Sequence, residues 1–273
     1  DQRGQPGAQA PYRLGARLAP LIGAAEDEVV VTDSTAINLF KVSAAALALR
    51  PARRVVVMDG SDFPTNTYVI QGLTALMDRG YQIRFAEHPD LAKALDETVA
   101  AAILNQAHYR TGRLLDMAAI TGRAHAVGAL AVWDLCHSAG VLPVDLNGAG
   151  ADFAVGCTYK YLNGGPGSPA FIFAARRHHG MTAQPLTGWW GHAEPFAFER
   201  DYRPAAGIGQ LLTGTQPILS LAATEAGLDL AADVDIGQVR TKCLSLGDLL
   251  IRLMEERCPD AGFTLISPRD GAP

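Results

Sequence analysis

Short apolar segments alternate with helix-like segments over most of this 273-residue chain. Strand-like runs lie at 29–31, 54–58, 81–86, 99–104, 130–133, 153–155 and 171–173, and helix-like segments at 36–49, 66–78, 117–127, 218–232 and 236–256. Such alternation predicts βαβ units, in which helices flank a mostly parallel sheet. We therefore expect an α/β fold whose ligands bind outside the carboxyl ends of the strands.

The composition excludes several classes of protein. Hydrophobic residues make up 48% and charged residues 19% of the chain, which fits a packed core rather than a disordered chain. The net charge of −5 without a basic block argues against a nucleic-acid partner. No apolar run approaches the roughly 20 residues of a membrane span, and residues 1–7 lack the apolar core of a signal peptide.

The cysteines indicate a reducing compartment and no metal site. They lie in apolar contexts without metal-ligand spacing, so we expect reduced, buried thiols in a cytoplasmic protein. The cysteines are Cys136, Cys157, Cys243 and Cys258. The adjacent His178 and His179 have no further ligand pattern around them, and we expect both to be solvated.

The length and the patterning suggest one large domain followed by a smaller one. We assign residues 1–235 to the large domain and 236–273 to the start of a C-terminal α+β domain. The apolar run at 263–266 resembles a strand without a partner, and we expect that part of the protein is missing at both ends. Residues 184–215 are rich in Gly, Pro and aromatic side chains and predict a long, irregular, functional loop.

Two of the strand-like runs end in ionisable side chains. Asp134 follows the run at 130–133, with His137 three residues later, and Tyr159 and Lys160 follow the apolar run that starts at 153. Parallel strands would bring these side chains to one sheet edge. A lysine amine that bonds to an aldehyde, with a carboxylate that keeps a ring nitrogen protonated, suits pyridoxal 5′-phosphate (PLP).

Each of these residues also has a plainer interpretation. Lys160 could be a surface lysine, Asp134 a helix N-cap, and His137 an ordinary core histidine. The apolar run before Lys160 and the Asn-Gly-Gly-Pro-Gly segment after it favour a buried site with room for a bulky ligand. His137 could then hydrogen-bond Asp134 or stack over the ring.

Two segments that open helices could bind the rest of such a ligand. Residues 32–36 read Thr-Asp-Ser-Thr-Ala and predict either N-capping or phosphate binding by free N–H groups; Asp33 should then point away or act as a cap. Residues 62–66 read Asp-Phe-Pro-Thr-Asn, either a turn with Pro near the first helical position or a loop that stacks Phe63 on the ring. No dinucleotide or Walker motif is present.

Two further loops complete the candidates. The sequence Trp189-Trp190-Gly191-His192 predicts either a packed loop or the wall of a pocket for an aromatic substrate. The segment around Gly214 and Thr215 leads into a helix and offers another possible phosphate contact.

These motifs together resemble the kynureninases, PLP enzymes of fold type I, the fold of aspartate aminotransferase. The matching elements are Asp134-Leu-Cys-His137, Thr158-Tyr-Lys-Tyr-Leu-Asn163, Phe63-Pro-Thr65, Gly188-Trp-Trp-Gly-His192 and Gly214-Thr-Gln-Pro217. The resemblance covers most of the chain, and the Tyr-Lys-Tyr-Leu-Asn and Trp-Trp-Gly-His elements are its most specific parts.

The resemblance implies a role for each matching position. Lys160 bonds to PLP, Asp134 pairs with its ring nitrogen beside His137, and Tyr159 contacts the phosphate and is a candidate acid or proton relay. Trp189 and Thr215 would reach the phosphate from a partner subunit, so that a homodimer shares its active sites. The remaining implied cofactor contacts are Thr35, Ala36, Phe63, Pro64, Thr65, Asn66 and Asn105, and the implied substrate contacts are Trp190, His192 and Gly214.

The implied reaction is the hydrolysis of L-kynurenine to anthranilate and L-alanine in tryptophan catabolism. Lys160 would move the α-proton of the substrate while Asp134 keeps the ring nitrogen protonated; water adds to the γ-carbonyl, and the Cβ–Cγ bond breaks. Gly214-Thr215 resembles a bacterial pair that makes 3-hydroxykynurenine the poorer substrate.

The sequence also departs from the family's pattern. Asn66 stands where many members carry Asp, which puts a secondary charge near the cofactor in doubt. An N-terminal Gly-Asn-Ser-Leu-Gly-like segment and a late arginine for the substrate carboxylate are absent from these 273 residues.

Two alternatives stay open on the sequence. Another class-V aminotransferase-like enzyme, such as a cysteine desulfurase, typically carries His before its lysine and a mobile nucleophilic Cys, whereas Tyr159 precedes Lys160 here. A truncated, non-catalytic homologue that acts as a binding module is the other alternative. The intact pair of Asp134 and Lys160 argues against it.

Overall fold

A single mixed sheet organises the chain, in a computed structural model that describes residues 6–181 and 183–269. Its strand order is β1-β7-β6-β5-β4-β2-β3, and β7 alone runs antiparallel to the strands beside it. The strands are β1 (Val29–Thr32), β2 (Val55–Asp59), β3 (Gln82–Ala86), β4 (Val99–Asn105), β5 (Leu130–Asp134), β6 (Phe153–Cys157) and β7 (Ala170–Ala174). The predicted α/β fold with a mostly parallel sheet is confirmed.

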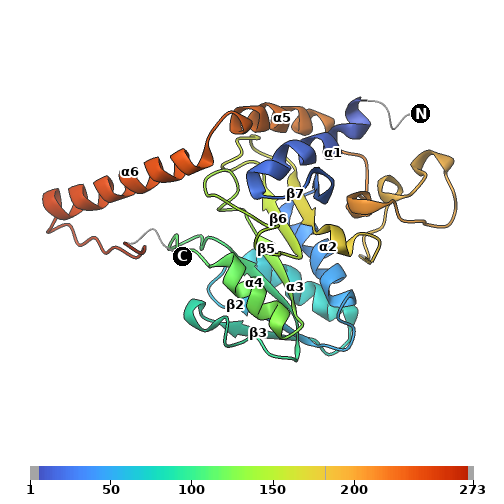
Figure 1. Cartoon of the computed structure of the whole chain (residues 1–273), viewed down its shortest axis with the longest axis horizontal. Coiled ribbons are helices and arrows are strands. Elements are labelled where there is room, and N and C mark those ends of the chain that lie inside the picture. Colours follow the sequence, from blue (N-terminus) through green and yellow to red (C-terminus); the bar gives the residue numbers. More distant parts are fainter. Residues whose placement is uncertain (1–5, 182, 270–273) are drawn as a thin grey trace.

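Helices cover both faces of this sheet (Figure 1). They are α1 (Pro6–Leu18), α2 (Thr35–Ala48), α3 (Pro64–Met77), α4 (Met117–Ala126) and α5 (Ile218–Ala232), and they are followed along the chain by α6 (Ile236–Arg257). One core joins the sheet to α1, α4 and α5 and contains Trp133, while the other joins it to α2 and α3 and contains Val132. Successive residues of a strand point to opposite faces, which is why fully covered strands read as continuous apolar runs.

Local signals in the sequence set where the helices begin. Ser34 caps α2 by accepting a hydrogen bond from the Ile37 N–H at 3.4 Å, and Asp116 caps α4 through the Ala119 N–H at 2.9 Å. Pro64 opens α3 at the first helical position, where its missing N–H costs nothing. Strands and helices that were predicted from the pattern lie within two residues of the observed bounds.

Helix α1 was not predicted, because Pro11 and Gly15 interrupt its pattern. It packs on β1 and α5 and buries Leu14 and Leu18. A Cβ at Gly15 would lie 2.1 Å from the Val29 carbonyl oxygen, so glycine is what permits this close approach.

Two expectations for the C-terminal part are wrong: the strand at 263–266 and the burial of Cys243 and Cys258. Helix α6 extends away from the sheet (Figure 1) and has no buried residue. The apolar run at 263–266 forms no strand, because the described segment beside it is helix α6 and not a strand that could pair with it. Cys243 and Cys258 are exposed because α6 extends away from the sheet, while Cys136 and Cys157 are buried as expected, and all four are free thiols.

Other sequence expectations concern the excursion and the termini. Residues 184–215 form an irregular excursion with only short 3-10 turns, as predicted. None of the described helices is long and apolar enough to cross a bilayer. The segments at 1–5 and 270–273, on which part of the signal-peptide and domain expectations rests, lie outside the described residues.

Candidate functional site

A cavity of about 910 Å³ opens at the carboxyl edge of the parallel strands. The starts of α2 and α3, the ends of β5 and β6 and the segment before α5 contribute its walls. Ten of the predicted site residues line it: Thr35, Ala36, Phe63, Thr65, Asn66, Asp134, His137, Tyr159, Lys160 and Thr215. The volume suits a cofactor with a small substrate.

Asp134 is the last residue of β5, in register with Asn105 on β4 and Val155 on β6. Only 4% of Asp134 is exposed. The Cys136 N–H donates to its Oδ1 at 2.8 Å, and the Asn66 Nδ2 donates to its Oδ2 at 2.9 Å. These two hydrogen bonds hold the carboxylate in one orientation at the cavity wall.

A second buried carboxylate, Asp62, lies behind this wall and was not among the predicted site residues. Its Oδ2 accepts a hydrogen bond from Asn66 Nδ2 at 3.1 Å, and its Oδ1 accepts one from Asn105 Nδ2 at 3.1 Å. Burial raises the pKa of Asp62, and the charge of Asp134 adds to that rise although the hydrogen bonds oppose it. The residue-type signal for Asp62 was present in the sequence, but a turn-forming aspartate explained it equally well.

Lys160 follows β6 and meets His137, which lies three residues beyond the end of β5. The distance between Lys160 Nζ and His137 Nε2 is 2.8 Å. Burial lowers the pKa of His137, and the neighbouring Lys160 lowers it further, so the ring is neutral at pH 7 and its Nε2 accepts from Lys160. The His137 Nδ1 is buried and has no hydrogen-bond partner within the described ranges.

Tyr159 stands beside Lys160 at the mouth of the cavity. Its side chain is half-exposed, and the Lys160 Nζ lies 5.8 Å from the centre of its ring. Partial burial raises the pKa of Tyr159 to about 12, together with the neighbouring Cys157 and Cys136. At neutral pH the phenol therefore keeps its proton and can donate it.

The start of α2 provides the positive end of the site. Helical geometry leaves the N–H groups of Thr35 and Ala36 without an intrahelical acceptor, and both residues line the cavity. Such groups bind anions, with the helix dipole adding to their attraction. A phosphate at this end would need no lysine in direct contact.

Asp33 lines the cavity in a left-handed conformation (φ 45°), and the N-cap of α2 is Ser34 rather than Asp33. Its charge is compensated from behind. The fully buried Lys41 donates to Asp33 Oδ2 at 2.6 Å and to the Leu211 carbonyl oxygen at 2.7 Å. Burial lowers the pKa of Lys41, which the pairing with Asp33 opposes. Lys41 was missed because it lies in the middle of an otherwise apolar helix.

Several other predicted residues lie away from this cavity. Trp189 and His192 line a separate cavity of about 410 Å³, and His192 is held by the Asp201 carbonyl oxygen at 3.3 Å. Trp190 packs edge-on against Trp189, with ring centres 4.6 Å apart. Three more lie near the Lys160 cavity without lining it: Pro64, Asn105 and Gly214.

Thr215 lines the cavity of its own chain, and its reach into a partner's site stays a prediction. His178 is buried rather than solvated, because its Nε2 bonds to Asp152 Oδ1 at 2.8 Å. Over residues 6–181 and 183–269 no group of three or more His, Cys, Asp or Glu is arranged to hold a metal.

Comparisons with known proteins confirm the resemblance that the motifs indicated. The chain is 52% identical over 264 residues to a protein named kynureninase from Burkholderia mallei (strain SAVP1), and 51% identical over 265 residues to one from Pseudomonas fluorescens. Each alignment covers 95% of this chain and 64% of the relative. The chain therefore spans a little under two thirds of the length of these relatives.

Solved structures confirm the fold. The apo cysteine desulfurase from Thermococcus onnurineus NA1 superposes with a TM-score of 0.78 at 18% identity, covering 92% of this chain and 63% of that one. The cysteine desulfurase CsdA from Escherichia coli gives a TM-score of 0.77 at 19% identity, covering 92% and 65%. At such identities the likeness concerns the fold alone.

The model of one protein family, described as aminotransferase class V, matches residues 12–265. That range includes the whole sheet, α2 to α6 and every residue that lines the cavity of Lys160. The chain belongs to the class-V aminotransferase family.

Proposed function

We propose that this chain carries the active site of a PLP-dependent kynureninase, which hydrolyses L-kynurenine to anthranilate and L-alanine. The observation that carries the proposal is the meeting of Lys160 and Asp134 in one cavity, from the ends of adjacent parallel strands. The 52% identity to a Burkholderia kynureninase supports this particular reaction within the family.

The residues present fit PLP. The uncapped N–H groups of Thr35 and Ala36 suit its phosphate, Phe63 offers an aromatic face to the ring, and Asp134 suits the ring nitrogen. The unpartnered Nδ1 of His137 leaves a buried polar atom for a ligand to satisfy. When bound, PLP supplies an electron sink for the carbanion that forms next to the amino group of the substrate.

The chain's own residues supply the proton transfers. Lys160, once the substrate has displaced it, takes the α-proton, and the neutral His137 ring orients its amine. Asp134, oriented by two donated hydrogen bonds, would pair with the ring nitrogen and favour its protonated form. Tyr159, protonated at neutral pH, donates a proton as water adds to the γ-carbonyl and the Cβ–Cγ bond breaks.

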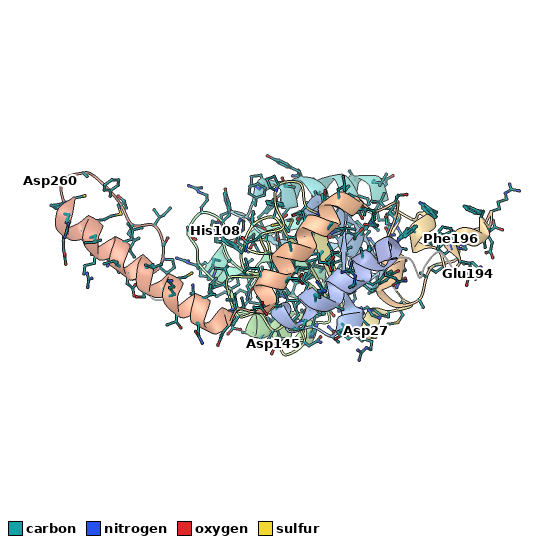
Figure 2. The ribbon with its side chains drawn as sticks, turned by 90° about the horizontal axis from the view of Figure 1, so that it is seen from above. Asp27, His108, Asp145, Glu194, Phe196 and Asp260 are labelled. Atoms are coloured by element: carbon teal, nitrogen blue, oxygen red, sulfur yellow. The ribbon has the colours of Figure 1, made fainter. Side chains whose placement is uncertain are left out.

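We further propose a homodimer whose two sites are shared. Trp189 and Phe198 have 40% and 80% of their side chains exposed, on an excursion that stands out from the body opposite Asp260; Glu194 and Phe196 mark it in Figure 2. Exposed aromatic clusters of this kind suit protein interfaces. In a partner's site, Trp189 would contact the cofactor, with Trp190, His192 and Gly214 near the aromatic part of the substrate and Gly214-Thr215 favouring kynurenine over its 3-hydroxy derivative.

We also propose a cytoplasmic location and a division of the chain into two domains. The free thiols are compatible with a cytoplasmic location. The absence of buried residues in α6 supports the assignment of residues 236–273 to a second, smaller domain, with residues 1–235 as the PLP-binding domain.

The experiment loads the protein with PLP and adds L-kynurenine. We expect a visible absorbance band, borohydride trapping of PLP on Lys160 as read by mass spectrometry, and anthranilate fluorescence. Lys160→Ala abolishes trapping and fluorescence, whereas Lys93→Ala, a matched change at an exposed lysine, leaves both intact. A band without anthranilate would favour another class-V enzyme, such as a desulfurase. Absence of both would favour a non-catalytic homologue.

Complementation tests the shared site. Lys160→Ala and Trp189→Ala proteins are each expected to be nearly inactive. Mixed dimers contain one site with both native residues and should regain activity. Mixtures that stay as inactive as their components would contradict the partner role of Trp189.

A further inference from the structure

Two buried carboxylates, Asp62 and Asp134, are joined through a single amide group. Asn66 Nδ2 donates to Asp134 Oδ2 at 2.9 Å and to Asp62 Oδ2 at 3.1 Å. All three side chains are at least 93% buried. Because both acceptors are carboxylates, the two N–H bonds of this amide are fully used, and the orientation of Asn66 is set from both sides.

Asp62 is not explained as a helix cap. Helix α3 begins at Pro64, its N-cap residue is Phe63, and no side chain accepts a hydrogen bond there in the capping pattern. Asp62 instead accepts the N–H of the adjacent Phe63 at 2.6 Å and the side-chain amide of Asn105 at 3.1 Å. Asn105 comes from β4, so the carboxylate is held by two different parts of the sheet edge.

Neither of the two carboxyl groups has a basic side chain paired with it among the described residues. Across the described ranges, no lysine or arginine lies within ion-pair distance of Asp62 or Asp134. Buried carboxylates without a cation reduce stability, and such groups concentrate at functional sites. Asp134 lines the cavity, whereas Asp62 lies behind it. A cation in the cavity would therefore contact Asp134 and would be attracted over a longer distance by Asp62.

We propose that Asp62 is a positioning residue that acts through Asn66: it orients the amide that holds Asp134 and adds a second negative charge behind the ring nitrogen of the cofactor. This inference rests on the proposed function, in that PLP is the ligand of the cavity. Many members of the family carry an aspartate where this chain has Asn66. In this chain Asp62 would supply that second negative charge instead.

The test compares two ligands that differ only at the ring nitrogen. Apo wild type and Asp62→Asn are titrated with PLP and with its 1-deaza analogue, in which a CH group replaces that nitrogen. We expect Asp62→Asn to weaken PLP binding about tenfold and to leave deaza-PLP binding within about twofold. The pH at which the visible band of bound PLP titrates should fall by about one unit, because removing an anion destabilises the protonated ligand.

The matched control is Asp59→Asn. Asp59 is equally buried, ends β2 at the same sheet edge and accepts hydrogen bonds from Ser61 rather than from Asn66. Its variant should bind both ligands as wild type does. Equal weakening of PLP and deaza-PLP by Asp62→Asn, or no weakening of either, would overturn the inference.

A second measurement does not depend on the folding of a variant. If the charge of Asp62 stabilises the protonated ring, the ring must lower the pKa of Asp62 by the same amount, because such coupling is reciprocal. Carboxyl ¹³C NMR of labelled wild type should therefore show that pKa about one unit lower with PLP bound than with deaza-PLP bound. An Asp62 titration that is the same with PLP as with deaza-PLP overturns the inference alone, whereas wild type that does not bind PLP overturns the proposed function as well.

Discussion

Replacing Gly227 by alanine should push helix α5 away from the loop that carries Lys160. A Cβ at position 227 would lie 2.4 Å from the Leu162 carbonyl oxygen and 2.8 Å from the carbonyl carbon of Asn163. Ordinary contacts begin at 3.4 Å, so the helix or the loop must move by about 1 Å to accept one methyl group. Both obstructing groups are backbone, and neither can rotate out of the way.

The expected cost follows from two opposing effects. Alanine in place of glycine within a helix contributes about 1 kcal/mol. Overpacking of a well-filled contact costs about 1–3 kcal/mol, and the rigid backbone contact places Gly227→Ala at the upper end of that range. The free energy of unfolding should therefore fall by about 2 kcal/mol, which lowers Tm by about 5 °C for a chain of this size.

Thermal unfolding followed by circular dichroism measures this effect, with Gly72→Ala as the matched control. Gly72 lies on the exposed side of α3, and a Cβ there would meet nothing within 4 Å. That variant should gain close to 1 kcal/mol and unfold about 2 °C above wild type. Should Gly227→Ala unfold at or above the wild-type temperature while Gly72→Ala behaves as expected, the close packing of α5 on the Lys160 loop would be refuted.

Three further predictions concern buried or shifted charges. Lys41→Met leaves Asp33 uncompensated at the anion end of the cavity, and titration should show phosphate and PLP binding about tenfold more weakly. Asp152→Asn removes the negative charge and one of the two acceptor oxygens shared by His125, His178 and Arg177 and should cost about 3 kcal/mol of unfolding free energy in urea. Burial alone would raise the Asp152 pKa, but its hydrogen bonds lower it overall. The stabilisation is therefore present above about pH 4 and is lost as the pH falls below the ordinary carboxyl range; a wild-type advantage that is largest at acid pH would contradict this sign. Tyr159→Phe should lower kcat without moving the alkaline limb of the pH–rate profile below pH 10, because the pKa of Tyr159 is raised to about 12.

Much of the fold and part of the site could be predicted because they depend on local patterns. Apolar runs ending at Asp134 and before Lys160 indicated two strands that deliver ionisable side chains to one edge, and the structure brings both into one cavity. The pattern failed at α1, where Pro11 and Gly15 are tolerated because the helix packs against Val29. It also failed at 263–266, since a strand forms only where a neighbour can pair with it.

The sequence by itself determined the residue types at the site, the faces of the strands and the helix starts, because each depends on neighbours a few positions away. Only the tertiary structure decided which charges meet. Strand order brings β4 between β5 and β2, so that Asn105 reaches Asp62, which Asn66 links to Asp134. Lys41 likewise donates to the carbonyl of Leu211, 170 positions along the chain. The periodicity of apolar residues predicts which face of a helix or strand a side chain occupies. The hydrogen-bond partners of that side chain depend on which segments the fold places beside it.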